Sequence, residues 1–206
     1  MAGTRAFIAI EVDKALKPAI NAVLQELKAM DCVTTTSSDN LHFTLFFFDS
    51  LNDNEINLVK AAMRIAARES FRLKLKGINF FMHRNDPQVV YIGIESSDAL
   101  VRLYSTLNSA LRQAGFDIDQ RPFSPHLTMG RVKSLSNPVK REALLSLRSK
   151  YSGKEFGSFT CRSLTLKKSV LTQTGPVHED MYKVDLANML TGCVPAGKLL
   201  SEMLLM

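Results

Sequence analysis

Two short stretches of the chain contain a histidine and a threonine separated by one residue. The first pair is His42 and Thr44 within NLHFTLFF, and the second is His126 and Thr128 within RPFSPHLTMGR. Successive side chains of a β-strand point to opposite faces, so in a strand each histidine lies on the same face as its threonine. The apolar residues that alternate with them would then face a core. Both stretches therefore predict strands that present a His and a Thr together.

The residue types in these stretches suit chemistry at phosphorus. An imidazole can donate or accept a proton near neutral pH, because its ordinary pKa is about 6.5. His42 and His126, facing one substrate, could therefore serve as an acid and a base at once. The hydroxyls of Thr44 and Thr128 can donate hydrogen bonds to phosphoryl oxygens, and Arg131 adds a permanent charge that binds phosphate in a bidentate manner. The pattern predicts hydrolysis or transfer at phosphorus without a metal.

Two alternatives stay open for these residues. A single His-x-Thr in a strand is more often an ordinary structural pattern, and only its repetition favours catalysis. A zinc site is the other alternative, but His83 and His178 follow no ligand spacing with the two motifs. The three cysteines are scattered along the chain. We therefore expect neither a metal nor a cofactor.

The pattern of apolar residues predicts a mixture of helices and strands. We expect helices over 14–30, 53–70, 98–114 and 137–150, and strands over 6–12, 41–48, 71–81, 88–95, 126–132, 158–171 and 180–186. Residues 34–40 are rich in Thr, Ser, Asp and Asn and predict a loop. Asp53 is expected to cap the second helix, and Gly115 to follow the third.

The order of these elements repeats. A shift of 84 residues places His42 and Thr44 on His126 and Thr128, and places AFIAIEV on VYIGIES. A duplicated chain explains this agreement. We predict an α+β fold with two similar lobes, each a mainly antiparallel sheet backed by helices, around a central groove. The lobes would span approximately 1–85 and 86–187 of a single domain, with a C-terminal extension over 188–206.

Composition and charge are those of an ordinary globular protein with an anionic partner. Of the 206 residues, 46% are hydrophobic and 22% are charged, which argues against wholesale disorder. The net charge of +6 falls entirely within residues 104–206, which favours RNA or a phosphate-bearing small molecule; a solvated basic face is the alternative. Glycine, proline and lysine interrupt 188–206, so we expect no membrane span. We predict a soluble, cytoplasmic monomer.

Taken together, the segments RAFIAIEVDKALK, NLHFTLFF, QVVYIGIE and RPFSPHLTMGRVK resemble the RNA 2′,3′-cyclic phosphodiesterases, also called 2′-5′ RNA ligases, of the 2H phosphoesterase superfamily. The resemblance extends over nearly the whole chain. It implies a bilobal fold and opening of a 2′,3′-cyclic phosphate at an RNA end without a metal. The product would be a 2′-phosphate beside a free 3′-hydroxyl, and the reverse reaction would join RNA ends.

By this resemblance, His42 and His126 are the general acid–base pair, and Thr44, Thr128 and Arg131 bind the phosphate. The resemblance favours His42 as the acid that protonates the leaving 3′ oxygen and His126 as the base that activates water. Both orientations fit a site with pseudo-twofold symmetry.

Two further residues enter through the same resemblance as nucleotide-binding candidates. Phe47 matches an aromatic position that can stack on the terminal base, although a core phenylalanine is an equal alternative. His178 stands where the family often has Tyr. The chain also departs from the family at Asp49, where Gly is common, and in having Phe46 and Phe48 near the expected nucleotide groove.

Two other function classes remain open from the sequence. One is a non-catalytic RNA- or nucleotide-binding module in which the histidines only contact phosphate. The other is a different 2H phosphodiesterase, which would cleave 2′-5′ oligonucleotides or a small cyclic phosphate.

Overall fold

The computed structural model describes residues 3–95, 97–119, 121–133, 135, 137–172 and 175–187. The predicted extension 188–206 lies outside these residues. The strands are β1 (Thr4–Glu11), β2 (Val33–Thr35), β3 (His42–Leu51), β4 (Phe71–His83), β5 (Asp86–Ile94), β6 (His126–Val132), β7 (Glu155–Cys161), β8 (Ser163–Thr172) and β9 (Gly175–Asp185). The helices are α1 (Lys17–Ala29), α2 (Asp53–Ala66), α3 (Asp98–Gln113) and α4 (Pro138–Lys150), with 3-10 turns η1 (Lys14–Leu16) and η2 (Ser38–Asn40).

Most predicted elements are confirmed, although β9 begins at Gly175 rather than at residue 180, α2 ends at Ala66 rather than at residue 70, and three further details differ. The cap of α2 is Asn52 rather than Asp53, because its side chain accepts a hydrogen bond from the amide of Glu55 while the Glu55 carboxylate accepts one from the Asn52 amide. The predicted loop 34–40 contains the end of β2 and the turn η2. The strand expected over 158–171 is two strands, β7 and β8, separated at Arg162.

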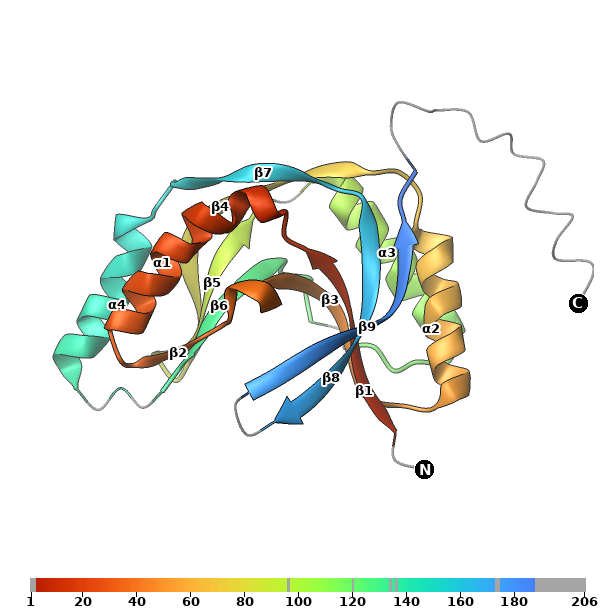
Figure 1. Cartoon of the computed structure of the whole chain (residues 1–206), viewed down its shortest axis with the longest axis horizontal. Coiled ribbons are helices and arrows are strands. Elements are labelled where there is room, and N and C mark those ends of the chain that lie inside the picture. Colours follow the sequence, from red (N-terminus) through yellow and green to blue (C-terminus); the bar gives the residue numbers. More distant parts are fainter. Residues whose placement is uncertain are drawn as a thin grey trace, which may run out of the picture.

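One antiparallel sheet runs through the described residues. Its nine strands follow the order β7-β4-β5-β6-β3-β1-β8-β9, with β2 paired to β6. The sheet is curled, with α1 and α4 outside one half and α2 and α3 outside the other (Figure 1). The α+β class with antiparallel strands backed by helices is therefore confirmed. The two predicted sheets are the two halves of this one sheet, which meet between β3 and β6.

The two halves of the sheet do not correspond to the two halves of the sequence. β4 comes from the first half of the sequence but lies between β5 and β7. β8 and β9 come from the second half, but β8 pairs with β1 and β9 pairs with the outer side of β8. Each half of the sheet therefore contains strands from both 1–85 and 86–187. The boundary near residue 85 falls in the hairpin between β4 and β5, inside one half of the sheet.

The repeat is real in the strand order, but its offset varies along the chain. Ile10 of β1 pairs with Phe43, and Ile92 of β5 pairs with Leu127, the equivalent residue of the second motif. The strands β1 and β5 are thus related by a shift of 82 residues, whereas the motifs are related by 84. The expected superposition of AFIAIEV on VYIGIES is wrong by two residues, because the segment between strand and motif is longer in the second half.

The core lies between the sheet and the helices. Alternation places Phe43 and Leu45 on the buried face of β3, opposite His42 and Thr44. Phe46 and Phe48 also belong to this core: Phe46 stacks on Tyr104 of α3 with ring centroids 4.7 Å apart, and Phe48 meets Phe116 edge to face at 5.4 Å. The expectation that these two rings lie by a nucleotide groove is therefore wrong.

Gly130 allows β2 to lie close against β6. A Cβ atom at this position would lie 2.6 Å from Cγ1 of Val33 and 2.8 Å from the carbonyl oxygen of Thr34. Both contacts are shorter than van der Waals separation, and the second is with backbone. The glycine therefore fixes the strand that carries His126 and Arg131 against its neighbour.

We predict that Gly130→Ala lowers the free energy of unfolding by about 1–3 kcal/mol, because β2 must move away from β6 to admit the methyl group. Urea unfolding of the two proteins at the same pH measures the difference. Equal unfolding midpoints and slopes would show that β2 is not held in this way.

Candidate active site

The two His-x-Thr motifs meet where the halves of the sheet join. β3 and β6 are antiparallel, and their paired residues are Phe43 and Leu127, the middle residues of the two motifs. In this register His42 lies across from Thr128, and Thr44 lies across from His126. Side chains that face each other on paired strands have Cβ atoms about 5 Å apart. The sheet therefore gathers both motifs in one patch, on the face opposite the buried Phe43 and Leu127.

Each histidine is held by a hydrogen bond to the backbone two residues before it. Nδ1 of His42 lies 2.6 Å from the carbonyl oxygen of Asn40, and Nδ1 of His126 lies 2.8 Å from that of Ser124. A carbonyl oxygen can only accept, so Nδ1 carries the proton in both rings. In the neutral state Nε2 of each ring then holds a lone pair that is free to take a proton from a ligand.

Rings and charges from the neighbouring strands surround His42. Its imidazole stacks on Phe7 of β1 with centroids 4.7 Å apart, and it meets the ring of His178 of β9 edge to face at 5.2 Å. Behind them Lys167 of β8 is buried and pairs with Glu11 at 2.6 Å and with Asp180 at 2.5 Å. Burial opposes the Lys167 charge, but these two carboxylates outweigh it and raise the lysine pKa.

This setting favours neutral His42. Burial is the main cause, and it lowers the pKa of His42 to about 4; the charges of His178 and Lys167 act in the same direction. The carbonyl of Asn40 and the carboxylate of Glu11 oppose the shift without cancelling it. His42 is therefore a neutral proton acceptor at pH 7 in the unliganded protein.

His126 has an aromatic rather than an ionic setting. The ring of Phe81 meets it edge to face at 4.7 Å, and Tyr91 does so at 5.4 Å. Burial lowers the pKa of His126, and the hydrogen bond to Ser124 opposes this change. No ion pair among the described residues lies in contact with this ring. The two histidines thus share backbone geometry but differ in their electrostatic surroundings.

A β-bulge brings Arg131 to the same face as the second motif. Between the pairs Tyr91–Thr128 and Val89–Arg131, β5 advances two residues while β6 advances three. The extra residue restores Arg131 to the face of Thr128, despite the odd spacing between them. Arg131 is exposed, and within the described part of the chain no carboxylate pairs with its guanidinium. It is available to an anion beside the motifs.

The equivalent bulge in β3 places Phe47 where the other half has Arg131. β1 advances two residues between the pairs Ala9–Thr44 and Phe7–Phe47, while β3 advances three. The Phe47 ring is 45% exposed, stacks against Phe7 at 6.4 Å, and has the guanidinium carbon of Arg5 4.8 Å from its centroid. Phe47 is therefore a surface ring on the motif face and not a core residue.

Sequence reasoning missed the residues that surround the two imidazoles. The segment RAFIAIE could have indicated three of them, because Arg5, Phe7 and Glu11 occupy odd positions of one strand and therefore share the face opposite the apolar residues between them. Lys167 and Phe81 gave no comparable signal, because their positions depend on how distant strands pair. All the predicted site residues come to one face of the sheet, and His178 contacts His42 itself.

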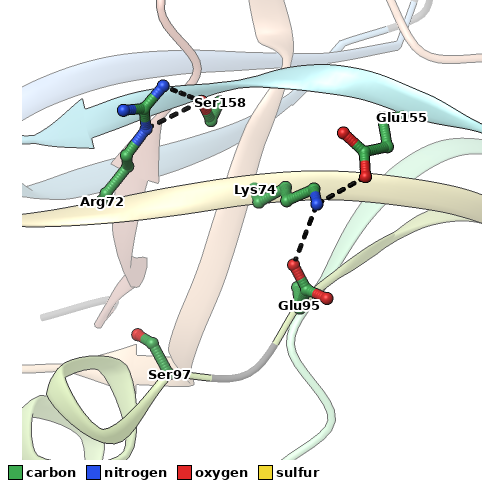
Figure 2. A pocket seen from close by; sticks show the side chains of 6 residues that line it. All are labelled: Arg72, Lys74, Glu95, Ser97, Glu155 and Ser158. Carbon is green, nitrogen blue, oxygen red and sulfur yellow. Dashed lines mark hydrogen bonds and ion pairs between the residues drawn. The ribbon is translucent and has the colours of Figure 1, made fainter.

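A separate cavity of about 450 Å³ lies by β4 and β7 (Figure 2). Lys74 in this cavity pairs with Glu95 and Glu155, and Arg72 donates to the hydroxyl of Ser158. None of the predicted site residues lines it.

Among the described residues, no group of three His, Cys, Asp or Glu side chains is placed to hold a metal ion. No helix in this part of the chain is long and apolar enough to span a bilayer.

A curled antiparallel sheet with paired His-x-Thr motifs at its centre is the architecture of a two-histidine phosphoesterase, and comparison with known proteins agrees. Residues 12–170 match the family model of the 2′-5′ RNA ligase superfamily, and the chain belongs to this family. It is 30% identical over 177 residues to the RNA 2′,3′-cyclic phosphodiesterase of Archaeoglobus fulgidus, covering 86% of this chain and 97% of that protein.

A second relative and a solved structure extend the comparison. The RNA 2′,3′-cyclic phosphodiesterase of Methanothermobacter thermautotrophicus is 32% identical over 180 residues, which cover 86% of this chain and 96% of that protein. The crystal structure of TT0787 from Thermus thermophilus has the same fold, with a TM-score of 0.75 and 22% identity over 90% of this chain and 99% of that one.

We predict that His42 makes the fold less stable in acid. Its pKa is about 4 when folded and about 6.5 when unfolded, so protonation favours the unfolded chain and stability is lost as the pH falls from 6.5 to 4. The contribution is about 3 kcal/mol. Urea unfolding at several pH values should show a flatter pH dependence for His42→Asn than for the wild type. Parallel curves would contradict the lowered pKa.

Proposed function

We propose that this protein hydrolyses the terminal 2′,3′-cyclic phosphate of RNA to a 2′-phosphate, by a two-histidine mechanism that requires no metal. The observation that carries the proposal is the pairing of Phe43 with Leu127, since it sets two imidazoles and two threonine hydroxyls about one point on the sheet. The names of the relatives, which are RNA 2′,3′-cyclic phosphodiesterases, support the substrate class.

In the proposed reaction, one neutral imidazole takes a proton from water as the water oxygen bonds to phosphorus. The bond from phosphorus to the 3′ oxygen breaks, and the other histidine, protonated, gives its proton to that oxygen. The hydroxyls of Thr44 and Thr128 and the guanidinium of Arg131 would stabilise the charge on the remaining phosphoryl oxygens. The product is a 2′-phosphate with a free 3′-hydroxyl. With a 5′-hydroxyl of RNA in place of water as the nucleophile, the same groups would join two RNA ends through a 2′-5′ phosphodiester and leave a free 3′-hydroxyl.

The electrostatic surroundings suggest a direction for proton transfer. His42 lies near the charge of Lys167 and has a pKa of about 4, so its ring is neutral at pH 7 and can accept a proton. His126 has no cation in contact among the described residues, and only burial depresses its pKa appreciably. We therefore assign the base to His42 and the acid to His126, which reverses the assignment that the family resemblance favours.

A substrate with sulfur in place of the 3′ bridging oxygen tests this direction. Thiolate leaves without protonation, so loss of the acid matters less with this substrate. We expect the sulfur substrate to restore most of the rate of His126→Ala and little of the rate of His42→Ala. If the sulfur substrate instead restored the rate of His42→Ala and not that of His126→Ala, His42 would be the acid.

The single substitutions test the proposed function itself. We predict that His42→Ala and His126→Ala each lower turnover of a cyclic-phosphate RNA end by roughly 10²–10⁴-fold, since each removes one proton-transfer group. The double variant should be little worse than either single one, because the pair acts as a unit. Chromatography against 2′- and 3′-phosphate standards identifies the product of the wild type.

Three results would count against the proposal. Binding without hydrolysis by the wild type would favour a binding module. Faster cleavage of 2′-5′ oligoadenylate than of the cyclic end would favour the other 2H phosphodiesterase activity. A 3′-phosphate product would show that the opposite bond of the ring is broken.

The pH dependence gives a further prediction. The profile of kcat/KM reports ionisation of the free enzyme, and burial lowers the pKa of both histidines. Above these pKa values the free protein lacks the protonated partner, so kcat/KM should peak below about pH 6.5 and fall towards alkaline pH. The peak of kcat should lie at higher pH, because bound phosphate stabilises the imidazolium. A kcat/KM that climbs up to pH 8 would contradict the lowered pKa values.

A further inference from the structure

His178 belongs to a cluster of three rings with Phe7 and His42. It lies on β9 and pairs with Ser169 of β8, so its side chain is on the sheet face that carries Lys167 and the motifs. Its ring meets Phe7 at 4.8 Å with an interplanar angle of 81°, and meets His42 at 5.2 Å with an angle of 88°. Perpendicular packing of this kind is a favourable arrangement for aromatic rings.

Nδ1 of His178 adds no hydrogen bond to this packing. It is buried, and it has no hydrogen-bond partner among the described residues. A buried polar atom without a partner costs about 1–3 kcal/mol. A phenylalanine would make the same ring contacts with Phe7 and His42 without that cost. The structure therefore gives His178 a role through its ring, and one of the two rings that it contacts, His42, is a proposed proton-transfer group.

The backbone ties His178 and His42 to the same residue. The Asn40 carbonyl accepts the hydrogen bond from Nδ1 of His42, while the Asn40 side-chain amide donates to the carbonyl of Pro176 at 3.3 Å, at the start of β9. The strand that carries His178 is thus linked to the residue that orients His42. The imidazole of His42 is held at Nδ1 by Asn40, on one face by Phe7 and from a further side by His178, and its Nε2 is not engaged by these contacts.

The equivalent sides of His126 are covered by Phe81 and Tyr91 instead.

The titratable and charged groups that act on His42 are Glu11 of β1, Lys167 of β8 and His178 of β9, and Asp180 of β9 forms an ion pair with Lys167. Burial and the charges of His178 and Lys167 lower the pKa of His42, while Glu11 raises it. Burial and Lys167 also lower the pKa of His178, which makes a neutral His178 the main form near pH 7.

We propose that His178 is a positioning residue for His42: its ring fixes the His42 imidazole between β1 and β9 and shields it from solvent while leaving Nε2 open to the substrate. This inference rests on the proposed function for its catalytic consequence. It differs from the expectation that His178 binds the nucleobase, because the ring contacts of His178 are with His42 and Phe7. His178 acts on the reaction through His42.

Two substitutions of His178 and one control separate the possibilities. His178→Ala removes the ring, and His178→Phe keeps a ring of similar shape without the nitrogens. His83→Ala removes the exposed histidine at the end of β4, which is not among the rings that contact His42. For each protein we would measure kcat and KM with a nucleoside 2′,3′-cyclic phosphate, and follow the titration of His42 by NMR of its ring protons in the free protein.

We expect His178→Ala to lower kcat by about tenfold or more, with KM changed by less than about twofold, because the reacting nitrogen is no longer held in place. The titration midpoint of His42 should move from about 4 towards about 6.5 as water reaches the ring. His178→Phe should keep kcat within about threefold of the wild type and move the midpoint less. His83→Ala should leave both measurements unchanged.

Two results would overturn the inference. A raised KM with unchanged kcat and unchanged His42 titration would assign His178 to substrate binding. A lower melting temperature with neither kcat nor the titration altered would leave only a packing role. If the wild type showed no turnover, the proposed function would fail, and the NMR titration of the free protein would still decide whether His178 controls the environment of His42.

Discussion

The antiparallel pairing of Phe43 with Leu127 is the contact on which the rest of the structure depends. Among the described residues it is the one paired position between β3 and β6, and it joins the two halves of the sheet at the centre of both motifs. Because both residues are buried, burial of their side chains holds the polar neighbours of each on the opposite face. The same contact thus closes the core on one side and assembles the histidines and threonines on the other. A slip of one residue in either strand would turn that strand's histidine and threonine into the core.

The two halves of the site are alike in backbone and different in charge. Each histidine donates from Nδ1 to a carbonyl two residues earlier, and each strand has a bulge after its threonine. The side chains around this frame have diverged: Phe47 in one half corresponds to Arg131 in the other, and the ionic group of Lys167 beside His42 has aromatic rings as its counterpart beside His126. A symmetric frame with unsymmetric surroundings therefore places two identical side chains in different electrostatic environments.

The sequence predicted the elements well where a local pattern decides them. The alternation in HLTMGRV gave β6 with its observed limits, and amphipathic spacing gave α3 to within a residue. The sequence failed to predict strand limits that depend on pairing with distant strands. Residues of β7 and β8 were expected to form one strand, because only the pairing of β7 with β4 and of β8 with β1 separates them. The motif residues were found because they repeat. Lys167 and Phe81 were not, because nothing local distinguishes a lysine or phenylalanine that a folded sheet brings beside a histidine.

The most direct test of the account is a crystal structure of the protein with a nucleoside 2′,3′-cyclic vanadate, whose five-coordinate metal centre imitates phosphorus during attack. We expect Nε2 of His42 and Nε2 of His126 to lie within hydrogen-bond distance of the two opposite apical oxygens, with both threonine hydroxyls on the equatorial ones. A vanadate held by only one of the two imidazoles, or bound elsewhere on the sheet, would contradict the claim that the joined strands build one site.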